Sequence, residues 1–294
     1  MNHNRKKITI VVNVDGSEAG SSRKTANDMA KAIENRYSID FLELSNENWL
    51  QKTIELPYES NRFCLLATHG GFGEDGRLQR ILELKNISFS HSRSVACSIM
   101  CNKHLTKLVY LSLGINTPQW RYGNKAYPLN EQIYLKPRQF LEKPIAGGSK
   151  IGIHIIKQLP RTHSNSMIYE KIIPGNKEVS IGVLGNSDKL FALYPIIRVR
   201  DVANIGKLEK TKVTIDKKVT KLCQEWAKTV HLSLECRGVT KTDFLIDENN
   251  QVWGIETDAI PGLSENNAVA IAAKRSNVPY KNLVNMLITE TYAN

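Results

Sequence analysis

This 294-residue sequence has no long hydrophobic run, no closely paired cysteines and no dense basic tract. The apolar run before Asn13 is too short for the core of a signal peptide, and no later run is long enough to span a membrane. The five cysteines include no Cys-x-x-Cys pair, so we expect buried, reduced thiols. These absences predict a globular, cytoplasmic protein.

The charge is strongly positive but is not concentrated anywhere. Lysine and arginine number 40 against 29 aspartate and glutamate, a formal net charge of +11, which favours an anionic partner such as a nucleotide, a nucleic acid or an acidic surface. The lysines are spread along the chain, and no basic stretch is interleaved with stacking aromatics. We therefore expect no nucleic-acid and no membrane partner, and nucleic-acid binding is the least favoured alternative.

The first third of the chain predicts a parallel βαβ domain. Residues 7–14 have the continuous apolar character of a buried strand, and a helical pattern follows near 23–35. The segments SIDFLEL and RFCLLAT then predict two further strands. We expect this domain to end near Ser94.

The rest of the chain predicts two more α/β or α+β units. A helix is expected over 98–114, and the segments EQIYLKP, GGSKIGIHIIK and SMIYEKII after it read as antiparallel strands. Beyond them, the strand segments EVSIGVLG, LFALYPIIRV, GVTKTDFLID and QVWGIET alternate with helices at 217–232 and 267–274. The domains that we expect therefore span 1–94, 95–175 and 176–294.

A glycine-rich stretch at residues 67–79, ATHGGFGEDGRLQ, suggests a dinucleotide-binding loop at first sight. Its glycines match Gly-x-Gly-x-x-Gly, and it lies between an apolar run and a helical pattern, as that motif requires. Glu74 and Asp75, however, would lie where a pyrophosphate should bind and would repel it. We therefore expect this loop to face something other than phosphate.

Three carboxylates fall on two strands that are predicted to pair. A polar turn starting at Asp247 joins the strands, so Asp243 should lie near Glu256 and Asp258, and the two-residue period puts positions 256 and 258 on one face. Such charges repel unless a cation lies between them, and these oxygen ligands suit Mg²⁺. A solvated hairpin with scattered acids is the alternative, which is less favoured because strands are usually depleted of aspartate.

Two lysines and one glycine-rich turn are candidate phosphate ligands. Lys136 ends the segment IYLKP, and Lys103 lies on the helix after Ser94; a lysine at a strand end is a natural phosphate ligand. The turn AGGSKIG offers backbone amides around Ser149. It is not a P-loop, because Gly-x₄-Gly-Lys-[Ser/Thr] and a following helix are both absent. Taken singly, these features are also typical of surface lysines and a hairpin turn.

In this order, the segments resemble the ATP-grasp ligases and, within them, the D-alanine–D-alanine ligase family. HGGFGEDGRLQRILEL is similar to the family's H-G-x-x-G-E-D-G-x-x-Q-G-x-L-E, and CRGVTKTDFLID with IETDAIPGLS is similar to its last block. The shorter segments NISFSHS, NKHLTK, YLKP, GGSKIG and YEKIIPGNKEVSIGVLG follow in the family's order between these two. The resemblance covers nearly the whole chain and implies a three-domain ATP-grasp architecture with an N-terminal parallel βαβ domain.

The resemblance also implies an activity and roles for single residues. The activity is that of a carboxylate–amine ligase that uses ATP and two Mg²⁺ or Mn²⁺ ions, forms an acyl-phosphate and makes D-alanyl-D-alanine for the peptidoglycan of the cell wall. The implied reacting residues are Glu18, which would hold the ammonium of the first amino acid, Ser149 and Lys241. The implied substrate residues are His69, facing the second amino acid, Ser264 and Asn267. The implied ligands of ATP are Lys103, Lys136, the backbone around Ser149, Glu170, Lys171, Ile173 and Glu178, and those of the metal ions are Asp243, Glu256 and Asp258.

Four features depart from the family's pattern. Lys241 stands where the family has an arginine, and a lysine cannot make a forked contact. Asp258 replaces an asparagine and adds a negative charge. Asn267 replaces a serine that grips the second substrate, although the helix that opens there, with Ser264 as its expected cap, can bind an anion. The segment 198–214 stands where the family has a lid loop with tyrosines, and it contains none.

These departures keep two alternatives open, a ligase with another amino-acid substrate and a non-catalytic nucleotide-binding relative. Retention of all three acids favours catalysis, because an inactive site has no need for clustered carboxylates. The expected partners are small amino-acid substrates, and a homodimer is left open.

Overall fold

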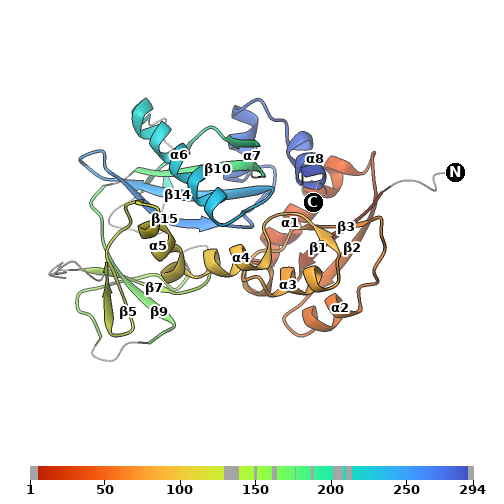
Figure 1. The fold of residues 1–294 in the computed structure, drawn as a ribbon, viewed down its shortest axis with the longest axis horizontal. Helices are drawn as coiled ribbons and strands as arrows, with labels where there is room; N and C mark the ends of the chain where they lie inside the picture. The colour runs from red at the N-terminus through yellow and green to blue at the C-terminus, as the bar shows by residue number, and fades with distance from the viewer. Residues whose placement is uncertain are drawn as a thin grey trace.

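The computed structural model arranges the chain in three domains (Figure 1). The residues that it describes are 6–128, 139–148, 151–160, 164–175, 177–186, 189–200, 208–209 and 214–290. Lys136, Ser149 and most of the segment 198–214 lie outside the described residues, so the predictions for them stay predictions. No helix within the described ranges has both the length and the apolar character needed to cross a bilayer.

The N-terminal domain is a parallel sheet with the strand order β2-β1-β3-β4. Its elements are β1 (Lys7–Asn13), α1 (Ala19–Ile33), β2 (Ser38–Leu44), α2 (Trp49–Glu55), β3 (Arg62–Leu66), the 3-10 turn η1 (Gly71–Gly73), α3 (Arg77–Leu84) and β4 (Ser88–Phe89). The sheet is apolar on both faces because helices cover both, which confirms the predicted βαβ domain. The helix expected near 23–35 begins earlier, at Ala19, because the Gly-Ser stretch before it forms its first turn.

Two helices, and not one, connect the N-terminal domain to the central one. The single helix expected over 98–114 is divided into α4 (Ser94–Cys101) and α5 (Lys103–Ser112). The break lies at Asn102, whose backbone is extended and whose side-chain oxygen accepts a hydrogen bond from the backbone N–H of Leu105. Asparagine is a strong N-cap, so it starts a new helix where the apolar pattern alone predicts continuity.

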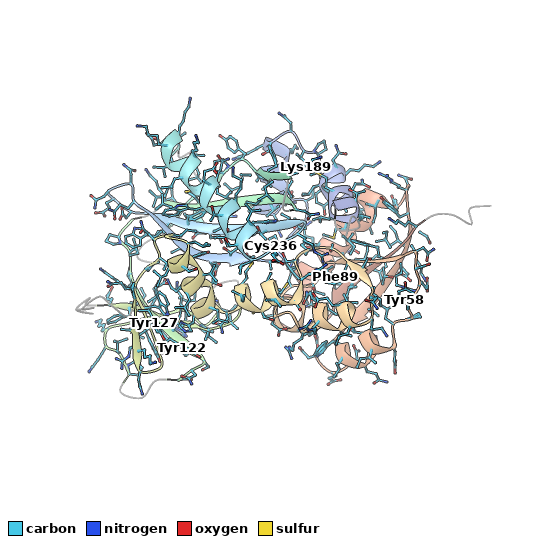
Figure 2. The ribbon with its side chains drawn as sticks, viewed as in Figure 1. Tyr58, Phe89, Tyr122, Tyr127, Lys189 and Cys236 are labelled. Atoms are coloured by element: carbon cyan, nitrogen blue, oxygen red, sulfur yellow. The ribbon has the colours of Figure 1, made fainter. Side chains whose placement is uncertain are left out.

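The central domain is an antiparallel sheet with the order β6-β5-β9-β7-β8. Its strands are β5 (Trp120–Tyr122), β6 (Lys125–Tyr127), β7 (Phe140–Pro144), β8 (His154–Ile156) and β9 (Met167–Lys171). The antiparallel strands predicted within GGSKIGIHIIK and SMIYEKII are confirmed, whereas EQIYLKP lies outside the described residues. An aromatic cluster of this domain, which includes Tyr122 and Tyr127, packs against His104 of α5 (Figure 2).

The C-terminal domain is a mostly antiparallel sheet covered by one long helix. The strand order is β13-β12-β10-β14-β15, and β11 also pairs with β10. The elements are β10 (Lys177–Asn186), β11 (Lys189–Ala192), β12 (Ile196–Arg200), β13 (Leu208–Glu209), α6 (Lys217–Ser233), β14 (Val239–Ile246) and β15 (Val252–Asp258). The predicted strand LFALYPIIRV is interrupted between Ala192 and Ile196, where Pro195 has no N–H to donate to the ladder.

The last two helices return to the N-terminal domain (Figure 1). α7 (Ala268–Arg275) and α8 (Tyr280–Glu290) contribute Val269, Leu283 and Leu287, among others, to the same hydrophobic core as β1 and α1. The range 176–294 is therefore continuous in sequence but is divided between two cores in space. This return places the loop before α7 beside the first domain, where Glu265 N–H donates a hydrogen bond to Asp28.

Candidate active site

A cavity between the central and C-terminal sheets collects most of the residues expected around ATP. Its lining includes Glu170, Lys171 and Ile173 from β9 and the loop after it, Glu178 from β10 and Asp243 from β14. Its volume is about 50 Å³, which is room for one or two water molecules. The cavity as it stands is therefore far smaller than a nucleotide.

A buried trio of charges lies at one wall of this cavity, where Glu170 and Lys143 line it and Lys107 is fully buried behind them. Glu170 is 2% exposed; its Oε2 lies 2.8 Å from Nζ of Lys107, and its Oε1 accepts a hydrogen bond from Lys143. Burial acts to raise the pKa of Glu170, but the two ammonium groups outweigh it and lower that pKa to about 2. Burial lowers the pKa of Lys107 to about 8, against the opposing effect of Glu170. Glu170 and Lys107 are therefore both charged at neutral pH.

Lys143 is a residue that the sequence analysis missed. The chain contains two Lys-Pro pairs, at 136–137 and 143–144, and we assigned the phosphate contact to the first. The structure puts Lys143 at the end of β7, in the cavity and on Glu170, whereas Lys136 is not described. A signal was available, because only the second pair directly precedes the glycine-rich turn AGGSKIG.

Lys103 holds the glycine-rich turn from the other side. Its backbone N–H donates to Ile145 O (2.8 Å), and its Nζ donates to Gly147 O (2.5 Å). Gly147 has a φ of +104°, a conformation that disfavours any residue with a side chain. The ammonium of Lys103 also acts on Glu256 of the hairpin, so Lys103 lies between the turn and the carboxylates.

The carboxylate hairpin is confirmed as strands β14 and β15. Asp243 lies opposite Glu256 and Lys241 lies opposite Asp258, so all four belong to one face of the sheet. Nζ of Lys241 lies 3.0 Å from Oδ2 of Asp243 and 2.8 Å from Oδ2 of Asp258. Burial acts to lower the pKa of Lys241, but the neighbouring carboxylates raise it well above its usual value. A lysine ammonium therefore occupies the space between two of the three acids expected to bind metal.

Glu256 is the acid left uncompensated in this hairpin. Burial, followed by the charges of Asp258 and Asp243, raises its pKa to about 7. Within the described ranges, no three Asp, Glu, His or Cys side chains are arranged so that they could already hold a metal ion. The donor set nevertheless fits Mg²⁺, because it consists of hard carboxylate oxygens on one face with negative charge in excess.

A second group of expected residues lies at the N-terminal domain. His69 is 5% exposed; its backbone N–H donates to Asn13 Oδ1 (2.9 Å), and its Nε2 is 3.0 Å from Thr25 Oγ1. The carboxylate of Glu18 packs directly against Gly70, where any Cβ would clash with it at 2.7 Å. Gly70, with a φ of +76°, therefore brings Glu18 beside the His-Gly loop. Asn13 and Thr25 are supports that the sequence analysis did not identify.

The expectation for the start of α7 needs one correction. The helix begins at Ala268, and Asn267, not Ser264, occupies its N-cap position. Ser264 instead accepts a backbone hydrogen bond from Asn267, because residues 264–267 form a turn before the helix. The side chain of Asn267 makes no capping bond; its Nδ2 packs against Gly262, where a Cβ would lie 2.3 Å from it. Both residues still lie at this helix N-terminus.

Comparisons with known proteins agree with this arrangement. The family model described as "D-ala D-ala ligase C-terminus" matches residues 113–289. A D-alanine–D-alanine ligase of Aquifex aeolicus is 26% identical over 297 residues, which cover 96% of this chain and all of that protein. A D-alanine–D-alanine ligase of Albidiferax ferrireducens is 30% identical over 246 residues, which cover 77% of this chain and 70% of that protein.

Two solved structures share the fold. The D-alanine–D-alanine ligase of Bacillus anthracis complexed with ATP superposes with a TM-score of 0.78 at 21% identity, covering 98% of this chain and 97% of that one. The VanG D-Ala:D-Ser ligase of Enterococcus faecalis has the same TM-score and identity, and covers 98% and 100%. The predicted three-part architecture is thereby confirmed.

Proposed function

The chain belongs to the D-alanine–D-alanine ligase family, and we propose that it joins two D-alanine molecules at the expense of ATP. The observation that carries this proposal is the shared cavity in which Lys143, Glu170 and Asp243 face one another. In this proposal Lys143 binds phosphate, Glu170 lines the adenine and ribose, and Asp243 is the first of the three metal ligands. A non-catalytic nucleotide-binding relative would need the same nucleotide residues, so turnover, and not ATP binding, distinguishes the two.

We propose that Lys143, together with Lys103, binds the phosphates of ATP. The two lysines lie at either end of the turn 145–148, whose backbone can approach a phosphate closely because it is rich in glycine. Glu170, Lys171, Ile173 and Glu178 would line the adenine and ribose, and the backbone around Ser149 would complete the phosphate site. The role first assigned to Lys136 passes to Lys143.

The lysine assignment can be tested by calorimetry with ATP. Lys143→Ala should weaken binding by about 1–3 kcal/mol, the scale of a hydrogen bond to a charged group. Lys125→Ala, which removes an exposed lysine from the edge strand β6 of the same sheet, is the matched control and should leave the affinity unchanged. A larger loss in Lys136→Ala than in Lys143→Ala would return the role to Lys136.

Asp243, Glu256 and Asp258 are the proposed ligands of two Mg²⁺ or Mn²⁺ ions. Bound divalent cations would neutralise the charge that develops on the phosphoryl oxygens during transfer. The ammonium of Lys241 already forms ion pairs with Asp258 and Asp243. The hydroxyl of Ser180 donates to the other oxygen of Asp243 (2.6 Å) and so fixes the orientation of that carboxylate. Equilibrium dialysis with Mn²⁺ and a non-hydrolysable ATP analogue would count the ions bound per chain.

The N-terminal residues supply the amino-acid sites in this proposal. Glu18 would receive the ammonium of the first D-alanine, and His69, held by Asn13 and Thr25, would face the second. Asn267, at the N-terminus of α7, would attract the carboxylate of the second substrate. His69→Ala should therefore raise the KM for the second amino acid and leave ATP binding unchanged.

Product analysis over a panel of amino acids tests the reaction itself. Phosphate and dipeptide should appear in a one-to-one ratio with D-alanine, whereas L-alanine should give neither. Phosphate in excess of dipeptide would show that the acyl-phosphate is lost to water, as expected if segment 198–214 covers the site poorly. D-serine belongs in the panel as a second candidate substrate, because one structural relative is a D-Ala:D-Ser ligase. Binding of ATP without any dipeptide would favour the non-catalytic alternative.

A homodimer is a further proposal. The N-terminal domain exposes five large apolar side chains, Phe41, Leu50, Ile54, Tyr58 and Leu84, and Tyr58 lies at its outer edge (Figure 2). Exposed apolar side chains favour association when they form a patch. Light scattering over a range of concentrations tests this proposal.

A further inference from the structure

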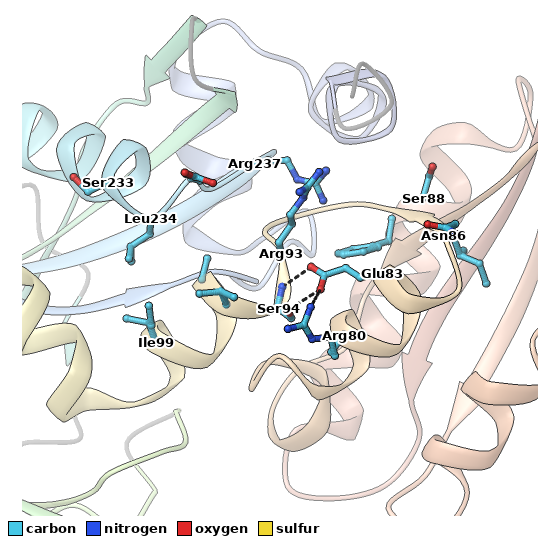
Figure 3. A pocket seen from close by; sticks show the side chains of 15 residues that line it. Arg80, Glu83, Asn86, Ser88, Arg93, Ser94, Ile99, Ser233, Leu234 and Arg237 are labelled. Atoms are coloured by element: carbon cyan, nitrogen blue, oxygen red, sulfur yellow. Dashed lines mark hydrogen bonds and ion pairs between the residues drawn. The ribbon is translucent and has the colours of Figure 1, made fainter.

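A second cavity lies where the N-terminal domain meets the C-terminal domain, and none of its lining residues belongs to the nucleotide cavity. It is formed by α3, β4, the start of α4 and residues 233–237 after α6 (Figure 3). Its volume is about 810 Å³, within the usual range for small-molecule sites. None of the residues assigned a role in the proposed function lines this cavity.

Three arginines and two glutamates line the cavity, and one arginine is already neutralised. Glu83 accepts hydrogen bonds from the backbone N–H (2.9 Å) and the hydroxyl (2.7 Å) of Ser94, and it pairs with Arg80 at 3.3 Å (Figure 3). Glu83 therefore caps α4 and compensates Arg80. Arg93 and Arg237 make no ion pair with any residue that the structure describes.

Arg237 is the side chain that most needs a ligand. Its Nε is buried and has no hydrogen-bond partner among the described residues, and its guanidinium lies 5.5 Å from the ring centre of Phe89. Burial and the nearby charge of Arg93 lower its pKa, and Figure 3 shows the two guanidinium groups close together. A buried donor left without an acceptor is costly, so its retention calls for an explanation.

The remaining lining is suited to an organic group. Apolar side chains contribute to the cavity from both domains, and they are Ile87, Phe89, Val95, Ala96, Ile99 and Leu234. Such walls can bury a carbon skeleton while a few polar groups fix its charged end. An inorganic phosphate ion alone would make no use of these apolar side chains, because it has no carbon skeleton to bury.

We propose that this cavity binds a small organic phosphate ester, with its phosphate on Arg93 and Arg237 and its organic group against the apolar walls. Guanidinium groups match phosphate oxygens through forked pairs of hydrogen bonds, and a phosphate on Arg93 and Arg237 would compensate two like charges that have no ion pair among the described residues. The ligand would contact the start of α4 and the 233–237 turn at once. Its binding therefore links the N-terminal and C-terminal domains and stabilises the folded chain.

The test is calorimetry with phenyl phosphate and with inorganic phosphate, each in the presence of a saturating non-hydrolysable ATP analogue and Mg²⁺ that fill the nucleotide site. We expect phenyl phosphate to bind the wild-type chain, and to bind at least tenfold more weakly after Arg93→Gln or Arg237→Gln. Arg77→Gln is the matched control, because Arg77 is an exposed arginine on α3 that pairs with Asp75 and does not line the cavity.

The two probes separate the two sources of the phosphate. Tighter binding of phenyl phosphate than of inorganic phosphate supports the ester, and equal binding would overturn the role of the apolar walls. Affinity that is unchanged in both arginine variants, or no binding to the wild type, would overturn the site. Arg93 is largely exposed, so Arg93→Gln keeps the test valid even if Arg237→Gln does not fold.

Discussion

Two clusters of charge at the nucleotide cavity differ in how completely they are paired. In the trio on the central domain, both oxygens of Glu170 are taken by lysines, and Lys107 also donates to Thr117 and Pro118. In the hairpin of the C-terminal domain, Lys241 pairs with Asp243 and Asp258 but not with Glu256, and burial together with those two carboxylates raises the pKa of Glu256. The first cluster is complete without a ligand, whereas the second has negative charge in excess. The difference indicates that the trio supports the fold, and it agrees with the cation site proposed for the hairpin.

The trio should show the largest effect on stability. Glu170→Gln leaves Lys107 and Lys143 buried without a counter-charge, so the free energy of unfolding should fall by about 3–5 kcal/mol. Urea unfolding of the purified variant measures this loss. Glu142→Gln, on the neighbouring strand β7, removes an acid of the same type without an ion pair in the described part of the chain and is the control. A loss below about 1 kcal/mol would contradict the view that the trio supports the fold.

The hairpin should show the opposite behaviour. Glu256→Gln removes a charge that its neighbours repel, so the free energy of unfolding should stay the same or rise. Turnover should fall by on the order of 100-fold or more, as it does when charge stabilisation of a transition state is lost. Parallel urea unfolding and dipeptide assays separate the two effects. A Glu256→Gln variant with a lowered free energy of unfolding and undiminished turnover would show that the hairpin, like the trio, supports the fold.

The pH dependence of the free energy of unfolding should distinguish the trio from a buried histidine of the C-terminal domain. Burial lowers the pKa of His231 to about 4, so this side chain is neutral in the folded chain between pH 4 and 6.5, while the unfolded chain takes up a proton. Stability from this residue is therefore lost as the pH falls from about 6.5 to 4, by about 3 kcal/mol at most. The lowered pKa of Glu170 also makes stability fall with falling pH, but the stability that it contributes is lost between about pH 4.5 and 2.

The measurement is urea unfolding between pH 4 and 7.5. His231→Gln can keep hydrogen bonds to Thr240 and to Gly185 O, and it should reduce the loss of stability between pH 6.5 and 4. His91, whose pKa burial lowers to about 3, and Glu256 also contribute to the profile in this range, so the readout is the difference between the wild-type and variant profiles. A difference that does not change between pH 6.5 and 4 would contradict a neutral, buried His231.

The hairpin and the trio also differ in how far the sequence predicted them. Alternating residues on two long strands were enough to place Asp243 opposite Glu256, because a two-residue period and a short turn leave little freedom. The trio could not be predicted in this way. Lys107 follows Lys103 by one helical turn and looks like a surface lysine, and its burial depends on strands that are distant in sequence.

Short elements and caps account for most of what was missed in the fold. β5 and β6 have three residues each, too few to show a period, and β13 has two. The break at Asn102 depends on one capping hydrogen bond, which the apolar pattern conceals. The unexpected packing of α7 and α8 on the first domain is a tertiary feature that no local pattern encodes.

The smallest effect concerns the ion pair between Lys241 and Asp258. Asp258 is 39% exposed on its side chain, so solvent screens the pair, and their coupling energy should be about 0.5–1 kcal/mol. A double-mutant cycle of Lys241→Met and Asp258→Asn, followed by urea unfolding, measures this value. A coupling as large as the loss expected for Glu170→Gln would show that the hairpin pair supports the fold as the trio does. A small coupling together with altered Mn²⁺ binding in Asp258→Asn would instead indicate that Asp258 is kept for the metal, and that Lys241 is there to balance its charge until the metal binds.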